Sequence, residues 1–239
     1  MFVNRLVSVN ANRLPAGRHG LSRELVVESQ RERVLRAVAE ATAERGYANV
    51  SVAEILKRAG VSRETFYEQF ANKEDCFLAG YEYALGVISH ELQKAIPPPP
   101  GTDDDGPLER LDRFVERYLA ALAREPAFAR AALIESYAAG PASVKRRSEG
   151  QARGAEAIAA LVEARDERQR FACEAFVTTV VGLATQRIGS GHSHELPDLH
   201  TPLMDFARSS MQAVGIGNHD PPVIPPIDRS GRGQPPSRR

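Results

Sequence analysis

Length, composition and charge limit what this chain can be. Its 239 residues suffice for one large or two small domains, and 42% hydrophobic residues suffice for a sizeable core. Lysine plus arginine equals aspartate plus glutamate at 31 each, so net charge indicates neither a nucleic acid nor an acidic lipid as partner. The two cysteines lie far apart and outside any CxxC spacing, which argues against a disulfide framework or a zinc site and favours a reducing cytosol. No stretch is apolar over the roughly 20 residues that span a bilayer, and the first twenty lack the apolar core of a signal peptide.

The chain opens with Asn, Gly, Pro and Arg in no sustained period, which predicts a flexible arm over residues 1–26. Beyond it the apolar spacing is helical almost everywhere, without the alternation that strands need, so we expect an all-α fold. A first helix is predicted from about Gln30 to Arg45, and Gly46 is a plausible left-handed cap at its end.

Two short helices with an intervening glycine follow. Ser51 and Glu54 match a capping box, in which each side chain satisfies a free backbone amide, and Gly60 suits a tight turn. Ser62 then caps a third helix, while Asn72 caps a fourth that runs to about Ile96. Phe66 and Phe70 are four apart and define the buried side of the third helix. The residues predicted on or beside its open side are Arg63, Glu64, Thr65, Tyr67, Glu68 and Gln69. The spacing predicts a helix-turn-helix between Ser51 and Phe70, in which one helix enters a major groove and the other braces it.

The remaining chain predicts a bundle of about six helices. Four consecutive prolines and a run of turn-forming residues predict a loop over Pro97–Pro107, and the Pro-, Gly- and Arg-rich end predicts a disordered basic tail over 215–239. We expect nine helices in all. Those after the loop cover about Leu108–Leu122, Pro126 to near Gly140, Ser143–Ala164, Glu167–Ile188, and a last helix that has Thr201 as cap and Pro202 at its first position and ends near Val214.

Residues Arg31–Tyr83 resemble the N-terminal domain of the TetR family nearly end to end. The pieces that carry the resemblance are Gly46-Tyr47, Ala59-Gly60-Val61-Ser62, Thr65-Phe66-Tyr67, Phe70 and Asn72-Lys73-Glu74. The resemblance implies a DNA-binding domain over 27–88 and a C-terminal ligand-binding and dimerisation domain over 89–214. It implies a bacterial, cytoplasmic transcriptional regulator without enzymatic activity or cofactor, a repressor that an apolar small molecule releases from a palindromic operator. The partners would be double-stranded operator DNA, a second copy of the chain and that ligand.

The same resemblance assigns DNA-binding positions in this sequence. Arg63 would contact guanine edges and Gln69 adenine, while Tyr67 and Lys73 would contact phosphates. The free amides at the starts of the second and fourth helices would add to the phosphate contacts. The full set is Ser51, Ser62, Arg63, Glu64, Thr65, Tyr67, Gln69 and Lys73.

Aromatic and apolar residues of the C-terminal part are candidates for the ligand cavity and the dimer interface. Tyr118, Tyr137 and Phe176 are ligand candidates, although core packing would explain them equally well. The last two helices carry apolar faces broad enough for a four-helix dimer interface. Those faces comprise Phe171, Ala175, Val180, Leu183 and Ile188, then Leu203, Phe206, Ala207, Met211 and Val214.

Other functions rest on single residue types. His192, His194 and His200 lie close enough in sequence to suggest a metal, but an exposed loop explains them better, and we predict none. Cys76 begins a helix, as redox-sensing thiols do, although most such cysteines are simply packed. An enzyme using His90 or a carboxylate as base has no supporting motif. An interaction protein with a helix-turn-helix that no longer binds DNA stays open, because Leu56, Glu64 and Glu68 depart from what DNA binding favours.

Overall fold

The computed structural model describes residues 22–94 and 106–217. Every regular element in these two ranges is helical, which confirms the all-α prediction. The nine α-helices are α1 (Arg23–Arg45), α2 (Val52–Ala59), α3 (Arg63–Tyr67), α4 (Lys73–Lys94), α5 (Pro107–Arg124), α6 (Pro126–Leu133), α7 (Pro141–Leu161), α8 (Glu167–Gly189) and α9 (His200–Gln212). Three 3₁₀ segments join them: η2 (Tyr47–Asn49), η3 (Glu135–Tyr137) and η4 (Ser193–Leu199).

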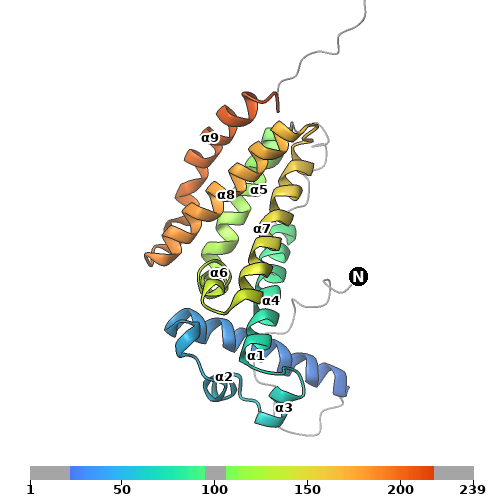
Figure 1. Cartoon of the computed structure of the whole chain (residues 1–239), viewed down its shortest axis with the longest axis vertical. Helices are drawn as coiled ribbons and strands as arrows, with labels where there is room; N and C mark the ends of the chain where they lie inside the picture. Colours follow the sequence, from blue (N-terminus) through green and yellow to red (C-terminus); the bar gives the residue numbers. More distant parts are fainter. Residues whose placement is uncertain (1–21, 95–105, 218–239) are drawn as a thin grey trace, which may run out of the picture.

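The helices form two groups along an elongated molecule. Figure 1 shows α1, α2 and α3 at one end, and α5, α7, α8 and α9 stacked lengthwise at the other. Helix α4 runs from the first group into the second, and α6 lies at the junction. None of the described helices is both long and apolar enough to cross a membrane.

The first group has its own core, but α6 completes it. Ile55 of α2, Phe66 of α3 and Phe77 of α4 are all buried in this cluster. Phe128 of α6 belongs to the same cluster, and its ring packs edge-on to that of Tyr83 in α4. The DNA-binding region predicted over 27–88 therefore shares its core with a helix that lies outside that range.

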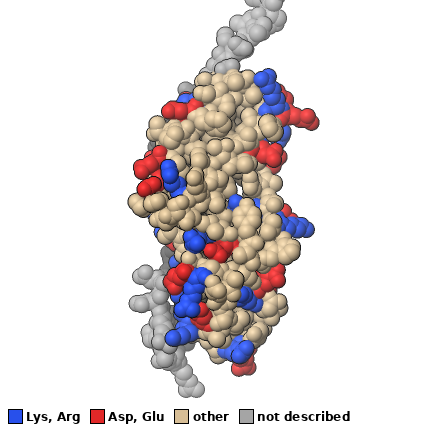
Figure 2. All heavy atoms as spheres, turned by 60° about the vertical axis from the view of Figure 1, so that its left-hand side comes forward, with Lys and Arg blue, Asp and Glu red and all other residues tan. Residues whose placement is uncertain are grey.

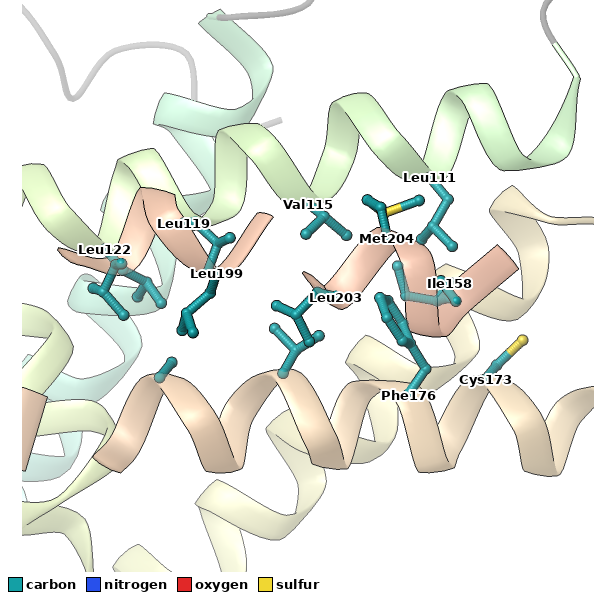
Figure 3. Close-up of a cluster of buried hydrophobic side chains, with 14 of the residues drawn as sticks. Leu111, Val115, Leu119, Leu122, Ile158, Cys173, Phe176, Leu199, Leu203 and Met204 are labelled. Carbon is teal, nitrogen blue, oxygen red and sulfur yellow. The ribbon is translucent and has the colours of Figure 1, made fainter. Parts of the chain in front are cut away.

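The second core lies between α5, α8 and α9. In Figure 3, Leu111 and Val115 of α5 face Leu203 and Met204 of α9, with Phe176 of α8 pointing between the two helices. Burial of these side chains removes apolar surface from water, which is the main force that holds the bundle together.

Several predicted helix ends are wrong. Helix α1 begins at Arg23, seven residues before the predicted start, because the Ser22 hydroxyl accepts a hydrogen bond from the Leu25 amide at 3.3 Å and caps it. Residues 23–26 are therefore helical and not part of a flexible arm. Pro107, predicted in a loop, is instead the first residue of α5, where its missing amide hydrogen costs nothing.

The last helix also differs from its prediction. Helix α9 begins at His200 and continues directly from η4, a 3₁₀ segment that was not predicted, so Thr201 lies within the helix and is not its cap. Beyond α9, the Ile216 amide donates to the Met211 carbonyl at 2.9 Å and its side chain is only 3% exposed, so the predicted disordered tail does not include residues 215–217. The rest of the predicted arm, most of the proline-rich loop and the rest of the tail lie outside the described residues.

Candidate nucleic-acid interface

Helices α2 and α3 meet through a turn that short-range capping explains. The Ser51 hydroxyl accepts from the Glu54 amide at 3.3 Å at the start of α2. Gly60 ends this helix with φ 63° and ψ 42°, a left-handed conformation that costs glycine little. The Ser62 hydroxyl then accepts from the Thr65 amide at 3.0 Å and starts α3. The predicted caps and turn are confirmed.

The second half of the predicted capping box is wrong. The Glu54 carboxylate does not bond the Ser51 amide; it pairs with Arg45, whose Nε lies 3.0 Å from its Oε1. A charge-assisted bond to a guanidinium is stronger than a bond to a neutral amide, so Arg45 at the end of α1 draws the carboxylate away. As a result, Glu54 ties α2 to α1.

Helix α3 presents a mixed polar surface at one end of the molecule (Figure 1). Phe66 is fully buried and fixes the inner side, while Arg63, Glu64 and Tyr67 are exposed. The Tyr67 side chain is 46% exposed, and its ring packs edge-on against Phe66 with centroids 5.2 Å apart. The Arg63 guanidinium lies 5.7 Å from the centroid of the Tyr67 ring. A cation and a phenol thus stand together on the exposed side, as the sequence predicted.

Two other predicted contacts are less available. The Thr65 hydroxyl lies 2.9 Å from that of Ser62, so both groups already have a partner within the turn. Gln69 lies beyond the end of α3, and its Oε1 atom is buried without a hydrogen-bond partner. Bidentate recognition of adenine needs both the oxygen and the nitrogen of a side-chain amide. The burial of this oxygen disfavours the assignment of Gln69 to adenine, which stays a prediction.

Lys73 occupies a structural position. Its ammonium donates to the carbonyls of Tyr47 and Val50, both at 3.0 Å, and lies 4.1 Å from the centre of the Tyr47 ring. An ammonium has three N–H donors, so at most one is left for a DNA phosphate. Lys73 joins the start of α4 to the segment that precedes α2.

Most other basic side chains of this region also hold it together. Arg33 donates to the Ala59 carbonyl at 2.9 Å, and Arg58 donates to Glu44 at 2.7 Å. The bond from Arg58 lowers the pKa of the Glu44 carboxyl below its usual range. Lys57, in contrast, is exposed and has no ion-pair partner among the described residues. Our sequence prediction missed it; its place two residues after the buried Ile55, on the open side of a helix, would have indicated it.

The three ligand candidates lie in different environments. Phe176 is 1% exposed in the second core (Figure 3), which core packing explains. Tyr118 of α5 is partly buried beside that core, and its ring stacks on Phe114 with centroids 6.3 Å apart. Tyr137 of η3 is 60% exposed, and its ring lies 4.7 Å from the guanidinium carbon of Arg147.

The reactive residue types lie in ordinary surroundings. Cys76 is fully buried, and burial raises the pKa of its thiol to about 12, which favours the packed interpretation over a redox sensor. The rings of His192 and His194 lie 6.2 Å apart, and His200 is instead near Asp112, 3.5 Å from its carboxylate. Within the described ranges, no three histidine, cysteine or acidic residues are placed to hold a metal ion.

Comparisons with known proteins agree with this geometry. Residues 34–79 match the family model described as "Bacterial regulatory proteins, tetR family". No curated protein matches the sequence. Solved structures resemble most of the fold. The fatty acid degradation regulator FadR from Bacillus halodurans is 20% identical with a TM-score of 0.59, and the match covers 74% of this chain and 94% of that one.

Two further solved structures have similar sequence identities and TM-scores. A TetR-like transcriptional regulator from Rhodococcus sp. RHA1 is 19% identical, with a TM-score of 0.58 and coverage of 82% of this chain and 99% of that one. FadR from Bacillus subtilis, solved in complex with stearoyl-CoA, is 19% identical, with a TM-score of 0.58 and coverage of 75% and 98%.

A capped helix-turn-helix at one end of an all-helical molecule defines the class: a DNA-binding protein of the helix-turn-helix type. The matched family model shows that residues 34–79 are similar to the DNA-binding part of the TetR family, and the described fold is similar to that of solved TetR-like regulators. Members of that family are non-enzymatic transcription factors.

Proposed function

We propose that this regulator is a homodimeric repressor that a small organic molecule releases from a palindromic operator. The observation that carries the DNA-binding half is α3, whose capped start and buried Phe66 hold Arg63 and Tyr67 towards solvent. Arg63 reaches guanine edges in the major groove, and Tyr67 contacts phosphate. Lys57 on α2 adds a second phosphate contact from the bracing helix.

The acidic neighbours of these groups limit the affinity of one copy. Glu64 and Glu68 are both exposed beside Arg63 and Tyr67 and repel phosphates. Two copies on one operator overcome this repulsion, because the second contact is made at a high effective concentration. The affinity of the dimer then exceeds what one helix-turn-helix supplies.

Helices α8 and α9 form the proposed dimer interface, although through fewer residues than the sequence suggested. Val180, Ile188 and Leu203 are buried within the monomer, so they are not available to a partner. Phe171 and Phe206 stay exposed at 69% and 45%, and Leu183 at 36%. Figure 2 brings the side of α8 and α9 forward and shows a broad uncharged area there. Large exposed apolar residues on such an area are typical of protein interfaces.

The geometry of the proposed dimer sets the distance between its two α3 helices and therefore the spacing of the operator half-sites. Its two α3 helices must enter successive major grooves, about 34 to 36 Å apart for half-sites one turn apart. A ligand in the second helix group favours a dimer with a different spacing, and its effect is limited by the difference between its affinities for the two forms. The ligand is a small organic molecule; the related FadR from Bacillus subtilis was solved with stearoyl-CoA.

Selection of binding sites from random duplex DNA tests the DNA-binding half directly. The purified protein is expected to enrich a palindrome, and the affinity for it is expected to fall as salt increases, because phosphate contacts release counterions. Arg63→Ala should relax base preference in each half-site, at a cost of about 1–3 kcal/mol in discrimination. Lys57→Ala should weaken binding to all sequences alike. No enrichment by folded, dimeric protein would favour an interaction module instead.

A further inference from the structure

The second helix group contains a buried cation without a counter-ion. Arg147 of α7 is only 9% exposed. Its Nη1 atom donates to the Ala132 carbonyl at a long 3.4 Å, and its guanidinium packs on the Tyr137 ring at 4.7 Å. No carboxylate within the described ranges lies at ion-pair distance from it. A guanidinium has five N–H donors, and a desolvated charge is unfavourable unless it is paired and hydrogen-bonded.

Other arginines of the same region do have carboxylate partners. Arg146, the preceding residue, pairs with Glu82 at 3.3 Å and Glu149 at 3.8 Å. These pairs are partly exposed, where an unpaired charge would cost little. Arg147 is buried, where a partner matters most, yet it has no carboxylate partner within the described ranges. This arrangement is expected when the partner is a molecule that the protein binds.

Further polar groups surround the guanidinium. Burial raises the pKa of Tyr118 of α5 to about 12 and also raises that of Tyr81 of α4, while the charge of Arg147 opposes both shifts. The charge of Arg147 thus acts on both hydroxyls, which stay protonated at neutral pH and can donate hydrogen bonds. One turn before Arg147, the Ser143 hydroxyl is fully buried and has no partner.

We propose that Arg147 binds the carboxylate of a small organic acid with an apolar body. The two phenols and the Ser143 hydroxyl surround the carboxylate, and Phe114, stacked on Tyr118, begins the apolar part of the site. A planar guanidinium suits a carboxylate because it can form two parallel hydrogen bonds. This inference rests on the proposed ligand-controlled function and replaces the apolar ligand expected from the sequence by an amphipathic anion.

The site is also close to a contact with the DNA-binding group. Tyr137, whose ring covers Arg147, belongs to η3. Two residues earlier, the buried Glu135 carboxylate accepts a hydrogen bond from the Tyr47 amide at 2.9 Å. A carboxylate that displaces Tyr137 therefore moves η3, the three-residue segment that contacts Tyr47 at the start of η2. The same bound acid thus acts on the position of α2 and α3.

Ligand binding by the full chain, without DNA, tests this site. The probes are straight-chain alkanoates from hexanoate to dodecanoate, with decanol and decyltrimethylammonium as neutral and cationic matches for decanoate. We expect an alkanoate to raise the melting temperature of the protein and to show binding in calorimetry. Decanol and decyltrimethylammonium should do neither. Arg147→Gln should weaken binding roughly ten- to a hundred-fold, the range for hydrogen bonds to a charged group. Arg146→Gln removes the same charge from the adjacent surface position and should leave binding unchanged.

The melting temperature without ligand separates a binding role from a structural one. Arg147→Gln should keep or raise it, because an uncompensated buried charge is removed. If that variant does not fold, Arg147→Lys is the second test. It keeps the charge but cannot form two parallel hydrogen bonds with a carboxylate, so it should bind the alkanoate more weakly than wild type. The proposal is overturned if decanol binds as tightly as decanoate, if neither Arg147→Gln nor Arg147→Lys weakens decanoate binding, or if no alkanoate binds. These ligand-binding outcomes do not depend on the selection of operator DNA. Failure of the proposed acid site can therefore be distinguished from failure of the proposed DNA binding.

Discussion

Replacing Glu135 with alanine should loosen the contact between the two helix groups. The Glu135 carboxylate accepts a hydrogen bond from the Tyr47 amide at 2.9 Å and lies 3.5 Å from the Arg130 Nε atom. The Glu135 residue is 7% exposed, so water cannot readily replace the lost acceptor. Glu135→Ala leaves a backbone N–H without a partner in a largely dry position.

The size of the effect follows from these contacts. An unsatisfied buried donor costs about 1–3 kcal/mol. The ion pair with Arg130 adds less, about 0–1 kcal/mol, because the Arg130 side chain is one-third exposed and its Nε forms no hydrogen bond with the carboxylate. We therefore expect Glu135→Ala to lower the free energy of unfolding by about 1–4 kcal/mol. Glu135→Gln keeps an oxygen acceptor and should lose only about 1 kcal/mol or less.

Urea unfolding at one fixed protein concentration measures these differences, since the proposed dimer would make stability depend on concentration. Amide hydrogen exchange at Tyr47 reports the bond itself: protection should fall in the alanine variant and persist in the glutamine variant. Glu116→Ala, at an exposed position on α5, is the matched control. If both Glu135 variants unfold like the control, or Tyr47 stays protected in Glu135→Ala, the carboxylate does not join the two groups.

Three further predictions concern single side chains. Lys73→Met should lower stability by about 1–3 kcal/mol even without DNA, because the carbonyls of Tyr47 and Val50 lose a charged donor; unchanged urea unfolding together with lost operator binding would show that the ammonium serves DNA alone. Cys76 should not react with a thiol reagent at pH 8 until the protein is unfolded, because burial raises its pKa to about 12; rapid labelling of native protein would contradict this. Phe206→Glu should convert the proposed dimer to a monomer in light scattering, since a charge would be buried in the proposed interface; an unchanged dimer mass would exclude Phe206 from that interface.

The helix-turn-helix could be predicted from sequence because its determinants are local. Ser51, Gly60 and Ser62 act within four residues of their own positions, and two phenylalanines four apart define the inner side of α3. The start of α1 was missed because helical periodicity is weak in its first turns, where the residues are mostly exposed. A hydroxyl cap gives a clear signal only when a strong apolar pattern follows it.

Tertiary contacts explain what sequence reasoning missed. Lys145, Arg146 and Arg147 form a basic run that is typical of a solvated helix surface. Only the packing of α7 against α4, α5 and η3 determines that the third of them is buried. In the same way, Lys73 was predicted to face phosphate because nothing local indicates that two backbone carbonyls more than twenty residues earlier receive its hydrogen bonds.

The shared core of α1 and α6 has a consequence for protein engineering. A hybrid regulator made by grafting residues 27–88 onto another effector domain would leave behind Phe128 and Ala131, which fill the space against α1 and α4. The grafted helix-turn-helix would keep its sequence but lose the α6 side chains that complete its hydrophobic core. The α6 of the new effector domain would have to fill the same space against α1 and α4. Specificity exchange in this protein should therefore be made by substituting the exposed residues of α3 on the intact chain, since a cut between the two helix groups would divide one core.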